Sequence, residues 1–196
     1  MASFVIVVDM QRDFVAADGA LPVAGAQALV APMRAWLAGL RREDVAGVLF
    51  TEDTHVPEVY AGSAEATEFP PHCERGTAGW ELVVDPAALD AAIPRFVLEK
   101  GVFDMWAEPG MIERIDVPGA APRDLFFARL QDEGVTEVTV VGVAADYCVR
   151  WAVEGLIARG FRVTVPAALT RGIARQIDAV AAEEWAGAPV AIAEAV

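Results

Sequence analysis

The chain alternates short apolar runs, rich in β-branched residues, with longer stretches in which apolar residues recur every three or four positions. The first pattern predicts buried β-strands, and the second predicts helices. Strands are predicted at residues 4–8, 45–51, 96–99, 138–143, 161–165 and 190–193. Helices are predicted at residues 24–41, 86–93, 124–133, 146–159 and about 174–185.

Strands that alternate with helices predict an α/β fold, because each helix returns the chain to the same end of a parallel sheet. We expect a three-layer sandwich with Rossmann-like topology: a mainly parallel sheet of about six strands with helices on both faces. The length of 196 residues suits one domain, spanning residues 1–196. The loop after the second strand and residues 108–123 show no period and are predicted to be irregular.

Reactive side chains gather at the predicted carboxyl ends of the strands, where open α/β sheets bind ligands. Asp9 follows the first strand, Asp53 and His55 follow the second, Lys100 follows the third, and Cys148 follows the fourth. Because these ends share one edge of a parallel sheet, the residues are predicted to lie close together.

The charge balance excludes some classes of partner. With 29 acidic and 15 basic residues, the formal net charge is −14, so binding to nucleic acid or an anionic membrane is not expected. A small-molecule substrate is favoured, and a homo-oligomer is left open. No apolar run is long enough to span a bilayer, the N-terminus reads as a strand rather than a leader, and two cysteines indicate a reduced cytoplasmic protein.

The stretch "VVGVAADYCVR" places Cys148 in the first turn of a helix. Unpaired amides and the helix dipole favour an anion there, which predicts a lowered thiol pKa and a nucleophilic sulfur. Lys100, the only lysine, supplies a cation, and Asp9 can take the thiol proton and deliver it to a leaving group. The structural alternative is that Cys148 is a small core residue.

"TEDTH" and "FPPHCERGTAG" contain the only two histidines of the chain. Asp53 and His55 are two residues apart in an extended segment, so their side chains point the same way, and His72 is a third candidate ligand. Three ligands with open positions are typical of a catalytic metal site, which zinc, iron or manganese could occupy. The alternative is that both histidines are ordinary polar loop residues.

Five motifs, in order, resemble the nicotinamidase and pyrazinamidase branch of the isochorismatase-like cysteine hydrolases over nearly the whole chain. They are "VVDMQRDF", "TEDTH", "FPPHCERGTAG", "EKG" and "GVAADYCV". The resemblance implies an isochorismatase-like fold. Three positions depart from common family residues: Arg12 where many members have Asn, Phe69 where many have Trp, and Ala145 where Thr is common.

The resemblance also implies residue roles. Cys148 matches the nucleophile, Asp9 the general acid and base, and Lys100 the third catalytic residue. The metal ligands correspond to Asp53, His55 and His72, and Glu65 is the expected fourth ligand, with Glu58 and Glu68 as alternatives. A cis peptide is implied before Ala144, whose amide would join that of Cys148 in an oxyanion hole, and Phe14 and Phe69 would flank the substrate ring. Cys73 is expected to be structural.

The activity so implied is metal-dependent hydrolysis of nicotinamide, and of pyrazinamide, through a cysteine thioester. The products would be nicotinate, for pyridine nucleotide salvage, and ammonia. No organic cofactor is expected. Three alternatives remain: an amidase for another small amide, an isochorismatase-type hydrolase of an enol ether, and a non-catalytic metal-binding module. The enol-ether alternative is disfavoured by Cys148 and by the metal ligands.

Overall fold

One β-sheet forms the centre of the computed structural model, which describes residues 2–194. Along the sheet the strands follow the order β5-β4-β3-β2-β1-β6-β7-β9. Six consecutive strands, from β3 to β9, run parallel to one another and correspond to the six predicted strands. Their bounds are β1 Ser3–Val8, β2 Val45–Asp53, β3 Arg95–Lys100, β6 Glu137–Val143, β7 Arg162–Pro166 and β9 Val190–Ala193.

Three further strands make the prediction of about six strands too low. β4 (Met111–Arg114) and β5 (Ala120–Pro122) pair antiparallel beyond β3, and β8 (Thr170–Arg171) pairs with β6. The prediction that residues 108–123 are irregular is therefore wrong. These strands are short, and only Ile112 of β4 is buried, so they carry no alternating pattern that a sequence could reveal.

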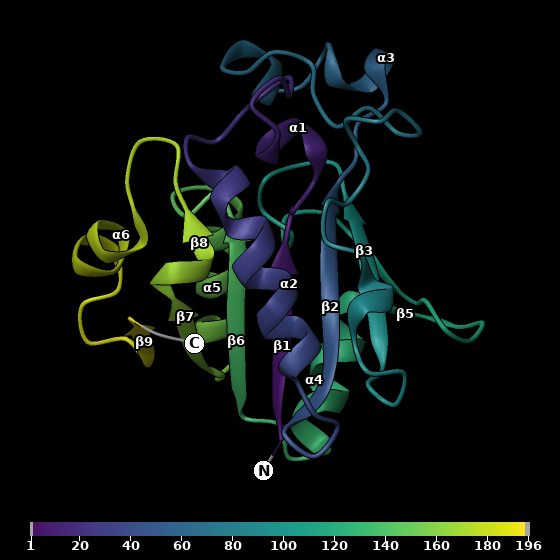
Figure 1. The fold of residues 1–196 in the computed structure, drawn as a ribbon, viewed down its shortest axis with the longest axis vertical. Helices are drawn as coiled ribbons and strands as arrows, with labels where there is room; N and C mark the ends of the chain where they lie inside the picture. Colours follow the sequence, from purple (N-terminus) through teal and green to yellow (C-terminus); the bar gives the residue numbers. More distant parts are fainter. Residues whose placement is uncertain (1, 195–196) are drawn as a thin grey trace.

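Helices cover both faces of the sheet, which confirms the three-layer α/β sandwich (Figure 1). α2 (Val30–Gly39) lies over one face, where its apolar side chains pack with Val5 and Val7. α4 (Arg123–Asp132) and α5 (Cys148–Ala158) lie behind the sheet with Phe4 and Ile6. Successive residues of β1 thus pack into the two hydrophobic cores on opposite faces of the sheet. α6 (Ile177–Glu184) lies at the β7–β9 edge.

Several predicted helices are shorter than expected. The predicted helix at 24–41 is a 3-10 turn, η1 (Ala26–Leu29), followed by α2, and the one at 86–93 is only the 3-10 turn η3 (Pro86–Ala88). Four short elements were not predicted, because one turn of helix has no measurable period: α1 Arg12–Val15, α3 Pro57–Tyr60, η2 Glu65–Thr67 and η4 Ala167–Leu169.

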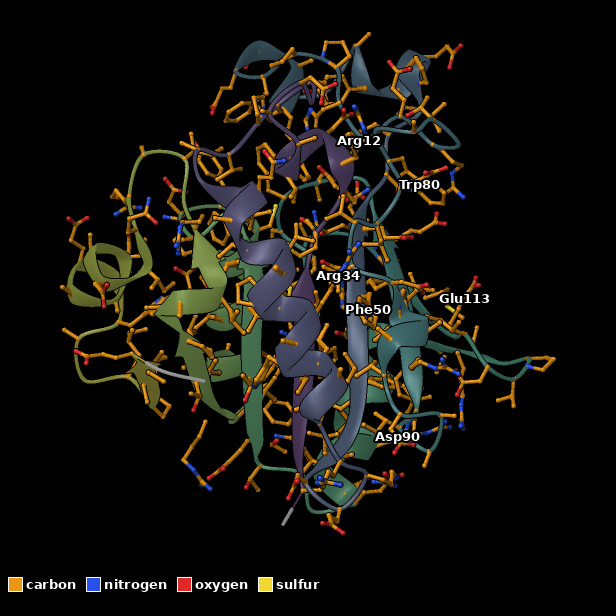
Figure 2. The ribbon with its side chains drawn as sticks, viewed as in Figure 1. Arg12, Arg34, Phe50, Trp80, Asp90 and Glu113 are labelled. Atoms are coloured by element: carbon orange, nitrogen blue, oxygen red, sulfur yellow. The ribbon has the colours of Figure 1, made fainter. Side chains whose placement is uncertain are left out.

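A layer of loops, with α1 and α3, lies beyond the carboxyl ends of β1 and β2 (Figure 1). In Figure 2, Arg12 and Trp80 lie in or beside this layer, whereas Phe50 lies in β2, well below it. The layer brings the long loop after β2 above the strand ends. Among residues 2–194, no helix is both long enough and apolar enough to cross a membrane.

Candidate active site

Asp9 lies directly after β1 and is fully buried. Its backbone φ of 47° falls in the left-handed region, which residues other than glycine seldom adopt. The Thr51 hydroxyl donates to Asp9 Oδ1 over 2.5 Å, and Lys100 Nζ lies 2.9 Å from Asp9 Oδ2. Both carboxylate oxygens are therefore held by side chains from the neighbouring strands β2 and β3.

Lys100, the last residue of β3, places its ammonium among three side chains. Besides Asp9, Nζ lies 3.3 Å from Asp53 Oδ1 and 3.6 Å from Cys148 Sγ. Burial alone would lower the pKa of Lys100, but the charges of Asp53 and Asp9 outweigh burial and raise this pKa well above its usual value. The side chain therefore stays cationic at neutral pH.

Cys148, the first residue of α5, is buried beside this ammonium. Burial raises the pKa of the thiol well above its usual value, and the charges of Asp9 and Asp53 add to that effect, although Lys100 lowers it. The expectation that the start of a helix would lower this pKa is therefore wrong for this structure, because desolvation is the larger influence. A raised pKa favours the neutral thiol, whose proton a base would remove before the sulfur attacks.

A second cluster adjoins the first through Asp53, the last residue of β2. Asp53 Oδ2 lies 3.1 Å from both His55 Nε2 and His72 Nε2. Burial alone would raise the pKa of Asp53, but Lys100 and the two histidines lower it. His72 Nδ1 lies 2.8 Å from the Pro70 carbonyl oxygen, a contact that leaves Nε2 free to bind a metal.

Glu65 completes this cluster. One ligand atom from each of Asp53, His55, Glu65 and His72 lies within 4.8 Å of the others, and all four residues are buried. Glu65 Oε2 is buried without a hydrogen-bond partner among the described residues, and burial together with the charge of Asp53 raises the pKa of this carboxyl. A buried oxygen with no partner, facing two imidazoles and a second carboxylate, fits a divalent cation.

The side chain of Gln11, fully buried, fixes the segment that carries Asp53. Its Oε1 accepts from the Asp53 amide over 2.7 Å, and its Nε2 donates to the Asp53 carbonyl over 2.8 Å. Nε2 also donates to the Trp80 carbonyl over 2.8 Å. Trp80 in turn donates from Nε1 to Thr54 Oγ1 over 2.9 Å. One glutamine thus joins the end of β2 to the loop that contains His72.

The Isochorismatase domain family matches residues 3–194. The chain belongs to this family. It is 32% identical over 188 residues to the nicotinamidase/pyrazinamidase of Mycobacterium tuberculosis, covering 94% of this chain and 95% of that protein. The family resemblance seen in the five motifs is therefore confirmed.

Two solved structures extend the likeness to the fold. The pyrazinamidase of Pyrococcus horikoshii, in complex with zinc, superposes with a TM-score of 0.73 at 26% identity and covers 98% of both chains. PnC1 from L. infantum, in complex with nicotinate, also gives a TM-score of 0.73 at 26% identity and covers 97% of this chain and 91% of that one.

In this member of the isochorismatase family, three aromatic rings form a cluster beside the reactive residues. Phe69 lies 5.4 Å from both Phe103 and Tyr147, and Phe103 lies 5.3 Å from Tyr147, all edge to face. Phe14 packs separately against His72 at 5.2 Å. The motifs pointed to Phe14 and Phe69 only. Phe103 belongs to residues 102–123, which match no family motif and from which a contribution to the pocket was expected without a role for any single residue, whereas Tyr147 could have been suspected from its place next to Cys148.

The turn between β6 and α5 has the shape that the family resemblance implied. The peptide bond before Ala144 is cis. Within residues 2–194, the amides of Ala144 and Cys148 donate to no other group. Asp146 holds the turn in place, because its carboxylate accepts from three consecutive amides, those of residues 173–175, over 2.8 to 2.9 Å. The Ala144 amide in the turn and the Cys148 amide at the start of α5 are thus available to a ligand.

Of the three departures from common family residues, Phe69 lies in the aromatic cluster, whereas Arg12 and Ala145 lie outside the reactive cluster. Arg12 pairs with Asp18 at 2.7 Å, and its side chain is 40% exposed. Ala145 is buried and donates its amide to the Arg171 carbonyl. Cys73, like Cys148, is a free cysteine, and burial raises its pKa.

Proposed function

We propose that the protein is a metal-dependent nicotinamidase that also accepts pyrazinamide and works through a cysteine thioester. The observation that carries this proposal is the position of Lys100 Nζ, 3.6 Å from Cys148 Sγ and 2.9 Å from Asp9. The names of the relatives support amide hydrolysis as the reaction. The two cysteines, which form no disulfide with each other, support a cytoplasmic setting.

In the first step, Asp9 takes the proton of the Cys148 thiol. The thiolate gains the adjacent charge of Lys100, which offsets the cost of a buried anion. The sulfur attacks the carboxamide carbon, forming a C–S bond, and the carbonyl oxygen takes up the electron pair of its π bond. Asp9 then passes the proton to the amide nitrogen, the C–N bond breaks, and ammonia leaves a thioester on Cys148.

The amides of Ala144 and Cys148 would bind the oxygen anion that forms in this step. Both are free of other acceptors within residues 2–194, and amides at a helix start are oriented toward bound anions. Asp146 keeps the turn in place through amides of residues 173–175. In the second half, water attacks the thioester carbon and Asp9 takes one proton of the water. Asp9 passes this proton to the sulfur as the C–S bond breaks, which re-forms the thiol, and the product leaves as nicotinate after releasing its acid proton to solvent.

Asp53, His55, Glu65 and His72 would hold one divalent ion, with zinc, iron and manganese all compatible with the donor set. When bound, such an ion supplies a Lewis acid that orients the substrate and lowers the pKa of bound water. The chain itself places the ligands: His72 through its contact with Pro70, and Asp53 through Gln11. Phe14 and Phe69 would contact the pyridine ring.

Ammonia release from nicotinamide, pyrazinamide and an aliphatic amide tests this proposal, with metal content measured on the same samples. We expect hydrolysis of both aromatic amides, its loss after treatment with a chelator, and its return on adding a divalent metal. Preference for the aliphatic amide would favour an amidase for another small amide, and full activity with no bound metal would reject the metal site.

Cys148→Ala tests the nucleophile, with Cys73→Ala as the matched control. Both thiols are buried and free, but only Cys148 contacts an ammonium. We expect ammonia release to fall at least about a thousandfold in Cys148→Ala, a loss typical of removing a nucleophile, and to persist in Cys73→Ala. Undiminished release by Cys148→Ala would remove the thioester mechanism.

A further inference from the structure

Glu65 contacts both of the segments that carry the Phe69–Phe103 pair. Its backbone carbonyl accepts from the Phe69 amide over 2.9 Å, and its side-chain Oε1 accepts from the Phe103 amide over 2.6 Å. The two rings meet at 5.4 Å and 90°. Residues 34 positions apart in the sequence, Phe69 and Phe103, are therefore positioned by one glutamate.

The other carboxylate oxygen faces the metal ligands. Glu65 Oε2 lies 3.7 Å from His55 Nε2 and has no hydrogen-bond partner within residues 2–194. The carboxylate thus has one oxygen toward the cluster of Asp53, His55 and His72, and the other toward the Phe103 backbone. A cation bound by Oε2 would fix the rotation of the carboxylate and, with it, the acceptor of the Phe103 amide.

The rest of the segment after β3 is anchored elsewhere. Arg123 donates to the carbonyl oxygens of Met105 and Glu108, and Trp106 Nε1 donates to the Trp151 carbonyl over 3.1 Å. These contacts hold residues 105–108 against α4 and α5. Phe103 itself is connected to the metal ligands by the hydrogen bond from its amide to Glu65.

We propose that Glu65 is a positioning residue that couples metal binding to the aromatic wall: an ion held by Oε2 locks Phe103 against Phe69. Phe103 is thereby a specificity-determining residue for a planar ring, since an ion on Oε2 would hold the Glu65 carboxylate, and with it the Phe103 amide, in the position that the structure shows. The inference rests on the metal site of the proposed function and does not depend on which amide is hydrolysed.

Hydrogen exchange of the Phe103 amide tests the coupling in the full chain, zinc-loaded and chelator-treated. We expect zinc to slow this exchange at least about tenfold, the change that corresponds to securing one hydrogen bond to a charged acceptor. Glu65→Ala should exchange rapidly with or without saturating zinc. Glu65→Gln, which keeps the shape and an acceptor, should lose most of the zinc-dependent part. Exposed Glu68→Gln, the matched control, should behave like the wild type.

Equal Phe103 exchange with and without zinc in the wild type, or zinc protection retained in Glu65→Ala, would overturn the coupling. Nicotinamide hydrolysis, measured separately, distinguishes the two proposals. Zinc-dependent protection in a protein that leaves nicotinamide intact would uphold the coupling and remove the proposed substrate. Nicotinamide hydrolysis without zinc-dependent protection of the Phe103 amide would uphold the proposed substrate and remove the coupling.

Discussion

Thr51→Val removes one hydroxyl from the centre of the active site and changes little else. Thr51 is fully buried in β2, opposite Val8, and Val has nearly the same shape. The main lost bond is the one that Thr51 donates to Asp9 Oδ1 over 2.5 Å, and Thr51 Oγ1 also ceases to accept from the Asp9 amide over 3.2 Å. The Asp9 amide keeps an acceptor, because it also donates to the Thr51 carbonyl over 3.2 Å.

The magnitude follows from the charge of the acceptor. A hydrogen bond to an ionised group contributes about 1.5–3 kcal/mol to stability, so the urea midpoint of Thr51→Val should fall by about 1 M for a slope near 2 kcal/mol per M. The same energy corresponds to a roughly 10- to 100-fold loss in kcat if the bond orients Asp9 during proton transfer. KM should stay within about twofold, since Thr51 does not line the aromatic cluster.

Ammonia-release kinetics, measured together with zinc content, distinguish a loss of Asp9 orientation from damage to the fold. Thr51→Ser, which restores a hydroxyl, should recover most of kcat, and zinc content should be unchanged in both variants because Thr51 is not among the four clustered ligands. A folded Thr51→Val protein with wild-type kcat would refute the idea that this hydroxyl orients Asp9. A parallel loss of zinc would show that the substitution disturbs β2 itself.

Two other side chains give predictions of different kinds. Burial and the charge of Glu99 raise the pKa of Glu52 to about 7 from 4.5, so the folded protein binds a proton that the unfolded chain releases, and stability falls as pH rises between these values. Thermal unfolding should show that Glu52→Gln is more stable than the wild type at pH 8 by about 1–2 kcal/mol. This is below the full value of about 3 kcal/mol because Glu52 is only partly buried. A stability difference between the two proteins that is the same at pH 4 and pH 8 would contradict the prediction. Gln11→Ala removes the hydrogen bonds to the backbone of Asp53 and Trp80. Zinc affinity, measured by calorimetry, should therefore fall about 10- to 100-fold. An unchanged affinity would show that Asp53 is held in place without Gln11.

The convergence of reactive residues could be predicted because it follows from the parallel sheet. Buried β-branched runs identified β1, β2, β3 and β6, and parallel strands bring Asp9, Asp53, Lys100 and Cys148 to one edge. Nothing more than strand periodicity and the rarity of Lys and His was needed. The motifs then supplied the roles, which stay predictions until activity is measured.

Other features depended on contacts that no local pattern encodes. Glu65 lies in a single 3-10 turn, so spacing alone could not separate it from Glu58 or Glu68, and only burial beside His55 does so. The raised pKa of Cys148 has the same origin, because desolvation depends on how the whole core closes around the sulfur. Phe103 is positioned at the site by a hydrogen bond from its amide to the Glu65 carboxylate, a contact between segments far apart in the sequence.

The identity of Lys100 follows from the geometry around its ammonium. Three groups surround Nζ: Asp9 at 2.9 Å, Asp53 at 3.3 Å and Cys148 at 3.6 Å. A compact ammonium has three rotatable donors for three separate partners, whereas the planar guanidinium of Arg suits paired oxygens of one carboxylate. The other oxygen of Asp53 contacts both histidines. The Asp53 carboxylate therefore links the Lys100 ammonium, which would stabilise the thiolate, to the metal ligands. The chain has fourteen arginines and one lysine, and the compact ammonium at position 100 suits two hydrogen bonds, to Asp53 and Cys148, and an ion pair with Asp9.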